Sequence, residues 1–260
     1  MSTPTDKTLK AGTSKEWNWH PDLPVAVNPL FSWPPKPMAA LRWVTNNWLP
    51  MTEYTIYALI AWATWVWLLP PLEQMQTLSW VWVLQIWARN LILMIIFAQG
   101  LHLWLYGWKR QGDDFKYDRR GPARNARTFL WNDQYWDNIT YALLSGVTIW
   151  TFYDVIVWIG YANGWAPMIT MQSNPIWFFT LFLFLPLIQT FHFYWIHRAL
   201  HIPFFYKRVH SVHHRSVSVA PWSGFSMHPI EHFFYMSLLL IFLVIPAHPI
   251  HFIFMGYSLV

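Results

Sequence analysis

Histidine is concentrated in one stretch of this sequence. Residues 192–214 read HFYWIHRALHIPFFYKRVHSVHH and hold six of the twelve histidines. Two groups within the stretch have the spacing of metal ligands, an HxxxH pair and an HxxHH triplet. Their members are His197, His201, His210, His213 and His214. On a helix, positions three and four apart share a face, so each group would aim two or three imidazoles at one point. We interpret them as metal ligands; the alternative is surface or core histidines without metal.

The composition of the two groups narrows the choice of metal. Imidazole suits zinc, copper, iron and nickel. A zinc hydrolase usually adds a general-base carboxylate, as in HExxH, and neither group contains Asp or Glu. The chain has no cysteine, which excludes thiolate zinc sites and disulfides. Five or more imidazoles exceed the needs of one tetrahedral zinc, so two metals fit better. Two irons that bind O₂ would suit an apolar neighbourhood and an unactivated C–H bond.

The elements that must position these histidines belong to an apolar chain. The sequence is 55% hydrophobic, 20% aromatic and only 11% charged, whereas an ordinary soluble domain is about one-quarter charged. The net charge of +5 is more typical of a cytoplasmic membrane face than of a nucleic-acid footprint. We therefore expect a membrane protein and no nucleic-acid partner.

Apolar segments near the length of a bilayer span define the expected fold. The predicted spans are about 52–71, 91–107, 139–162 and 176–196. Arg89 and Asn90 would be costly at mid-membrane, so we expect 79–90 to lie oblique or interfacial. A fifth apolar region, 233–260, is broken by prolines and would form one kinked span or a re-entrant pair. The fold class is an all-α integral membrane protein.

Basic residues predict the orientation of the chain. They lie in the N-terminal segment, 108–138 and 197–232, whereas the connections 72–78 and 163–175 have none. The alternation favours four spans with a cytoplasmic N-terminus and a cytoplasmic, helical, histidine-rich cap. The domains would be a polar, Pro-rich segment (1–50) and a membrane domain (51–260). Asp154, within the third span, would be either near an interface or paired.

The order of the motifs resembles a known family. FYWIHRALH, then KRVHSVHH, then PWSGFSMHPIEH is similar to the fatty acid hydroxylase/sterol desaturase superfamily of membrane di-iron oxygenases, over about 176–260 and more loosely over 50–175. The resemblance implies an enzyme with two irons, O₂ and an external electron donor that hydroxylates or desaturates fatty acyl chains or sterols. It implies that the five histidines of the two groups are ligands. With no haem or flavin motif in the chain, the redox partner would be separate, such as cytochrome b5 or a ferredoxin.

The family's third histidine group, an HxxHH-type motif, is missing. After His214 the sequence offers only HPIEH, with His228 and His232, and HPIH, with His248 and His251. We therefore expect the chain to be C-terminally incomplete; if it were complete, the metal site would lack ligands and activity would be doubtful. His228 would be a ligand, a residue that orients a ligand, or a structural residue at a helix start, where Pro229 and Glu231 also fit. His232 lies four residues after His228 and would share the same face of a helix.

Each of the other residues near the motifs has two possible roles. His192 would approach the metal or be an ordinary hydrogen-bonded helix histidine. Four aromatic residues would line a channel for an apolar substrate or serve as membrane anchors and core: Tyr194, Trp195, Phe204 and Trp222.

The expected function is lipid or sterol oxidation in lipid biosynthesis. The alternatives are other membrane di-iron chemistry, on ether lipids or carotenoids, and a non-catalytic metal-binding membrane protein. A transporter would place its ligands at mid-membrane, and here the motifs lie beyond the fourth span, which favours an enzyme. The expected location is the endoplasmic reticulum in a eukaryote and the inner membrane in a bacterium.

Overall fold

The computed structural model describes residues 29, 32–46, 48–112 and 120–260, and over these residues its regular structure is helical, without strands. The chain divides into two units, Met1–Leu49 and Pro50–Val260. In the first unit α1 (Pro37–Asn46) begins with a proline at its first position, where no backbone N–H is needed. The remaining helices, from α2 (Trp48–Trp67) onward, and the turns between them hold all the candidate site residues.

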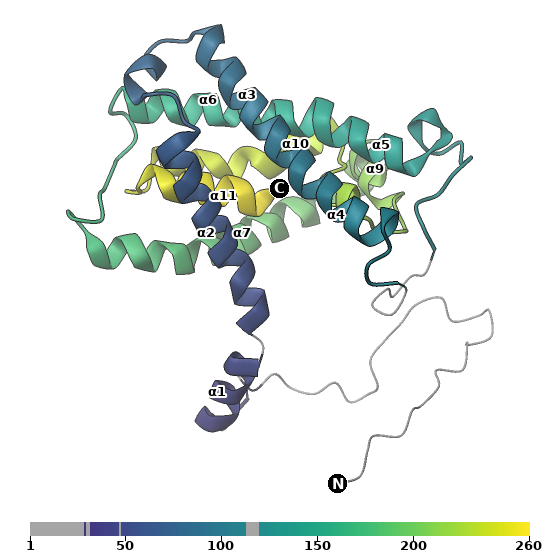
Figure 1. Cartoon of the computed structure of the whole chain (residues 1–260), viewed down its shortest axis with the longest axis horizontal. Coiled ribbons are helices and arrows are strands. Elements are labelled where there is room, and N and C mark those ends of the chain that lie inside the picture. The colour runs from purple at the N-terminus through teal and green to yellow at the C-terminus, as the bar shows by residue number, and fades with distance from the viewer. Residues whose placement is uncertain (1–28, 30–31, 47, 113–119) are drawn as a thin grey trace. The chain divides into compact units, whose positions relative to one another are not determined.

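The helix from Trp80 to Gly107 is the first of three long apolar helices (Figure 1). It consists of α3 (Trp80–Met94), a π turn (Ile95–Gln99), α4 (Gly100–His102) and a second π turn (Leu103–Gly107). Ser79 caps it by accepting a hydrogen bond from the backbone N–H of Val81. The expected separation of 79–90 from the span is therefore not seen, because Arg89 and Asn90 are buried within one continuous helix.

A buried polar cluster makes this continuity possible. The Arg89 guanidinium donates to Asp154 Oδ2 at 2.7 Å, and Asn90 Nδ2 donates to the same oxygen at 3.0 Å and to Thr151 Oγ1 at 3.1 Å. Pairing offsets the cost of burying a charge among apolar side chains. The sequence allowed Asp154 to be either near an interface or paired, and in the structure it is paired with Arg89.

The second long helix runs from Gln134 to Ala162 through α5 (Gln134–Thr140), a π turn (Tyr141–Val147) and α6 (Thr148–Ala162). Asp133 caps its start by accepting from the N–H groups of Tyr135 and Trp136. The π turn places Ser145 and Gly146 against the C-terminal part of the chain, where Ser145 Oγ lies 2.9 Å from His232 Nδ1.

The third long helix, α7 (Pro175–Leu200), carries the first histidine group at its C-terminal end. Asn174 caps its start. Large apolar side chains repeat every three or four residues along one exposed face: Ile176, Phe179, Leu183, Leu187 and Phe191. Such a face is suited to lipid contact. The three long helices alone, among the described residues, are long and apolar enough to cross a membrane; α2 is helical where another span was predicted but is not one of them.

Short helices follow α7. They are α8 (Pro203–Phe205), a π turn (Tyr206–His210), α9 (Ser211–His214), a 3₁₀ turn (Pro221–Ser223), α10 (Pro229–Met236), the 3₁₀ helix η9 (Ser237–Leu243) and α11 (Pro249–Leu259). The apolar region predicted to be broken is thus divided into α10–η9 and α11.

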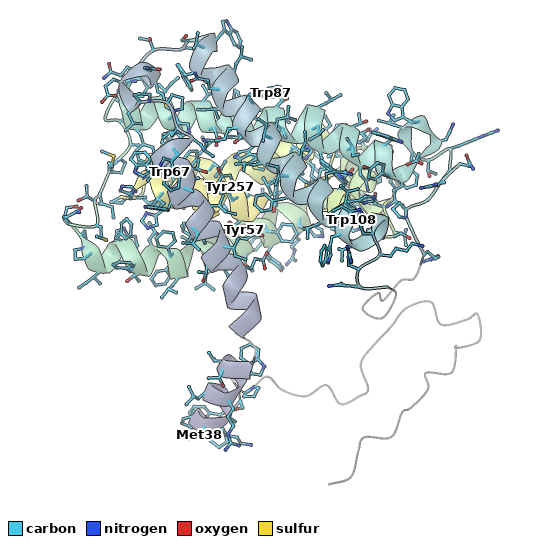
Figure 2. All side chains as sticks on the ribbon, viewed as in Figure 1. Met38, Tyr57, Trp67, Trp87, Trp108 and Tyr257 are labelled. Carbon is cyan, nitrogen blue, oxygen red and sulfur yellow. The ribbon has the colours of Figure 1, made fainter. Side chains whose placement is uncertain are left out.

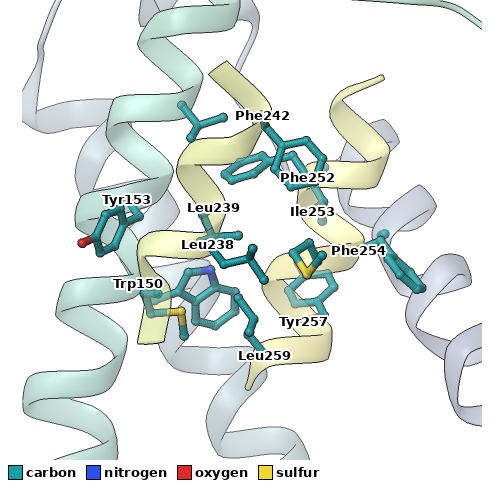
Figure 3. Close-up of a cluster of buried hydrophobic side chains, with 14 of the residues drawn as sticks. Trp150, Tyr153, Leu238, Leu239, Phe242, Phe252, Ile253, Phe254, Tyr257 and Leu259 are labelled. Carbon is teal, nitrogen blue, oxygen red and sulfur yellow. The ribbon is translucent and has the colours of Figure 1, made fainter. Parts of the chain in front are cut away.

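The core forms where these last helices meet α6. Figure 3 shows Phe252, Phe254 and Tyr257 of α11 beside Leu239 and Phe242 of η9. The Tyr257 hydroxyl lies 2.7 Å from Thr64 Oγ1 of α2, which ties that helix to the core. Aromatic side chains also cover the outside of the helices, and Trp67 and Trp108 are exposed where their helices end (Figure 2).

Candidate metal centre

Four histidines of the two sequence groups converge on one point. His197, His201, His210 and His214 each offer a ring nitrogen, and these four nitrogens all lie within 4.8 Å of one another. The Nε2 atoms of His197 and His201 are 3.0 Å apart, and those of His210 and His214 are 2.9 Å apart.

The local structure explains this convergence. His197 lies in the last turn of α7 and His201 is its C-cap, so the pair occupies one face at the helix end. The chain then turns at Pro203, and the π turn ends at His210 where α9 begins. His210 and His214 are four positions apart and share a face directed back at α7. The HxxxH pair and the outer members of the HxxHH group therefore face each other.

The donor set fits a metal ion. Two nitrogens bound to one metal at about 2.1 Å and a right angle would lie about 3.0 Å apart, which matches the spacing within each pair. Four neutral imidazoles suit iron, zinc, copper or nickel. Burial and the neighbouring histidines lower the pKa of His210 to about 3, and the same causes lower the pKa of His214. Both rings are thus neutral near pH 7, which is the state that binds metal.

A carboxylate lies directly behind this cluster. Glu231 Oε1 is 2.7 Å from His210 Nδ1, and both side chains are almost entirely buried. Burial raises the pKa of Glu231 to about 8. Sequence reasoning placed Glu231 only at a helix start, because nothing in its spacing links it to a histidine 21 residues earlier.

His213 has a different environment from the four clustered histidines. Its Nδ1 lies 3.2 Å from the backbone oxygen of Ser226, and its ring packs on those of His210 and His214. It also lines a small cavity of about 20 Å³ together with His197, Glu231 and apolar side chains that include Phe193 and Tyr235.

The histidines of HPIEH are placed by α10. His228 is the N-cap of α10, and its Nδ1 accepts a hydrogen bond from the N–H of Ile230. His232 is fully buried; its Nδ1 lies 2.9 Å from Ser145 Oγ and its Nε2 lies 3.2 Å from the Phe225 carbonyl oxygen. Burial lowers the pKa of His232 to about 4. In this arrangement both nitrogens of His232 have partners within the fold, outside the four-histidine cluster.

The remaining candidates lie around the cluster. His192 lies five residues before His197 in α7, and its Nε2 is 3.2 Å from Ser237 Oγ. Among the predicted channel residues, Tyr194, Trp195 and Phe204 are exposed and do not line the small cavity. Trp222 is buried and donates from Nε1 to Gln99 Oε1 at 2.9 Å.

The segment after the second histidine group is anchored to α5. Arg215 donates twice to the Asp137 carboxylate, at 2.6 and 2.7 Å, and Asp137 is fully buried. Ser216 donates to Asn138, and Gln134 donates to the Ser218 carbonyl oxygen. Sequence reasoning missed this anchor; the signal was the sequence DQYWDN at the start of an otherwise apolar span.

An apolar helix of membrane-spanning length that ends at a cluster of four imidazoles is typical of membrane proteins with metal centres built from histidine. Residues 179–260 match the model of the fatty acid hydroxylase family. Together with the relatives described next, this match supports the resemblance of the chain to the fatty acid hydroxylase/sterol desaturase superfamily that the histidine motifs predict.

Several relatives carry the names of sterol-modifying enzymes. The chain is 31% identical over 159 residues to a probable Delta(7)-sterol 5(6)-desaturase of Neurospora crassa, covering 57% of this chain and 44% of the relative. It is 34% identical over 125 residues to a C-4 methylsterol oxidase of Schizosaccharomyces pombe, covering 46% of this chain and 39% of the relative. It is 39% identical over 70 residues to a putative methylsterol monooxygenase of Dictyostelium discoideum, covering 27% of this chain and 26% of the relative. The chain spans less than half the length of these relatives, and no solved structure matches it.

Proposed function

We propose that this protein is a membrane-embedded, iron-dependent oxidoreductase that uses O₂ to hydroxylate or desaturate a lipid, with a sterol as the favoured substrate. The observation that carries the proposal is the convergence of His197, His201, His210 and His214 within 4.8 Å. The similarity to sterol desaturases and methylsterol oxidases supports the substrate class. Two irons per chain are proposed from the family, with His213 available as a fifth ligand.

The chain's own residues would hold and shield the metal. The four imidazoles supply neutral nitrogen ligands, and the metal with O₂ supplies the oxidising power to remove hydrogen from an unactivated C–H bond. Phe193, Leu200 and Met227 line the adjacent cavity and would exclude water from it. An apolar substrate would reach the centre from the bilayer side of α7.

Electrons would come from a separate protein. Three exposed basic residues lie near the histidines in sequence: Arg198 within the first group, and Lys207 and Arg208 between the two groups. Positive charge beside the centre suits an acidic donor such as cytochrome b5 or a ferredoxin. The positive-inside rule applied to the basic segments supports a cytoplasmic position for this face, which in a eukaryotic cell would be on the endoplasmic reticulum.

Metal analysis of the purified full chain tests the proposal. We expect about two irons per chain, lost in His210→Ala and in His214→Ala. His102→Ala is the matched control, because His102 is a partly buried histidine whose ring packs on Tyr106 and Tyr135. One iron per chain would contradict the proposed two-iron centre, and zinc alone or no transition metal would overturn the whole proposal. Sterol and fatty-acid profiles of cells with and without the protein would then identify the substrate.

A further inference from the structure

Glu231 is a buried carboxylate whose position the fold alone does not explain. Only 4% of the residue is exposed, and its one ionic contact in the described part of the chain is with His210. Its second oxygen, Oε2, is buried without a hydrogen-bond partner among the described residues. A buried charge normally has a compensating partner such as an arginine. A buried carboxylate without such a partner is a candidate for a role in the site.

The start of α10 does not require this carboxylate. Acidic residues are common in the first turn of a helix, where they interact with the helix dipole while remaining exposed. Here His228 already caps the helix through the N–H of Ile230. The Glu231 side chain is instead directed away from solvent, toward the π turn that ends at His210.

The two nitrogens of His210 face opposite partners. Nδ1 faces Glu231 Oε1 at 2.7 Å, and Nε2 faces the Nε2 of His214 at 2.9 Å, inside the four-histidine cluster. A neutral imidazole has one N–H and one lone pair. If Nδ1 carries the hydrogen and donates it to Glu231, the lone pair is on Nε2 and is directed at the metal position. In its ionised form, which a cation bound in the four-histidine cluster would favour, Glu231 can only accept, and it therefore selects both the tautomer and the ring orientation that a ligand needs.

We propose that Glu231 is a positioning residue of the metal centre, which holds His210 in the Nδ1–H tautomer with Nε2 directed at the metal. This inference rests on the proposed metal centre. It assigns a role to the third histidine-containing element, HPIEH, through its glutamate and not through its histidines.

Metal titration of the full chain tests the role of Glu231. Metal-free protein would be titrated with Co²⁺, whose visible absorption reports both affinity and ligand geometry. Glu231→Leu removes the acceptor, and we expect its Co²⁺ affinity to fall about 10- to 100-fold. Glu231→Gln keeps an oxygen that accepts from Nδ1–H, so it should recover much of the affinity, with a shifted absorption band. Glu73→Gln, at an exposed glutamate, is the control and should bind as the wild type does.

A structural role would give a different result. Glu231→Leu replaces a buried carboxylate by an apolar side chain, so metal-free Glu231→Leu should unfold at a temperature no lower than the wild type. If its metal-free stability falls along with its affinity, Glu231 supports the fold and the inference is wrong. Wild-type affinity in Glu231→Leu would overturn the inference and leave the metal centre in place. A wild-type chain that binds neither Co²⁺ nor iron would overturn the metal centre, and the inference with it.

Discussion

His213 and His214 are adjacent in the sequence but differ in their surroundings. His214 joins the cluster with His197, His201 and His210, whereas His213 lies against the Ser226 carbonyl oxygen and the small cavity. The difference follows from helix geometry, because consecutive side chains point about 100° apart. The two residues are therefore expected to contribute unequally to metal binding.

Alanine substitutions would measure this difference. His214→Ala removes one of four converging imidazoles, so we expect nearly complete loss of bound iron. His213→Ala leaves the four-histidine cluster intact, so we expect part of the iron to remain. Metal content measured on the two purified variants checks the prediction. Equal and complete loss in both variants would mean that His213 binds the metal together with the four clustered histidines.

At this scale the sequence predicted much of the site. The i, i+4 spacings of the two histidine groups predicted that each pair would share a face, and the structure brings both pairs together. The contact of Glu231 with His210 was not predictable, because it joins two helices through a turn whose path depends on packing. Of the three roles that the sequence allowed for His228, the one at a helix start agrees with the backbone hydrogen bond that its ring accepts at the start of α10.

The elements are held together by charged pairs that cross between helices. Asp137 of α5 accepts two hydrogen bonds from Arg215, directly after the second histidine group. Asp137 also accepts from the backbone N–H of Leu130. This carboxylate therefore fixes the start of one long helix against the histidine segment.

Asp137→Asn should loosen this segment. The amide has no negative charge and cannot accept two hydrogen bonds from Arg215 in the same geometry, so we expect the free energy of unfolding to fall by about 2–3 kcal/mol. Unfolding of the metal-free protein in detergent, followed by circular dichroism, provides the measurement. Glu73→Gln serves as the exposed control. Unchanged stability in Asp137→Asn would show that the Arg215 contact contributes little.

The Arg89–Asp154 pair joins α3 to α6 in a similar way but is more deeply buried, with side chains 7% and 3% exposed. Removing one partner leaves an unpaired buried charge, so Arg89→Leu and Asp154→Leu should each cost about 3–5 kcal/mol. The double substitution leaves no unpaired charge and should recover most of that loss. Thermal unfolding of the three variants checks this cycle. Additive losses in the double variant would contradict it.

Hydropathy predicted the long helices well because their composition is uniform. The predicted segments 139–162 and 176–196 lie within the helices Gln134–Ala162 and Pro175–Leu200. Residues 79–90 were expected to lie oblique or interfacial because of two polar residues, and the structure shows that from Trp80 they continue the helix of the predicted span 91–107. A sequence shows that a residue is polar but not that its partner, Asp154, lies on another helix at the same level.

At the scale of the whole molecule, the chain has no cysteine, which makes its sidedness measurable. The segments on either side of Gln134–Ala162 should lie on opposite faces of the membrane. A cysteine at Gly121 or Val217 should react with a membrane-impermeant reagent from one face, and a cysteine at Gln172 from the other. The basic residues of 108–138 predict that Gly121 and Val217 are cytoplasmic. Reaction of all three positions from the same face would contradict the topology.

The separation between the second long helix and α10 is set at Gly146. A Cβ added there would lie 3.0 Å from His232 Nε2 and closer still to the Phe225 ring. Only glycine, which has a hydrogen atom in place of Cβ, therefore fits this contact. A larger side chain would have to displace the Phe225 ring first and would press on the ring of His232 in α10. A glycine in the wall of a helix acts here as a spacer that sets how closely the third histidine-containing element approaches the second long helix.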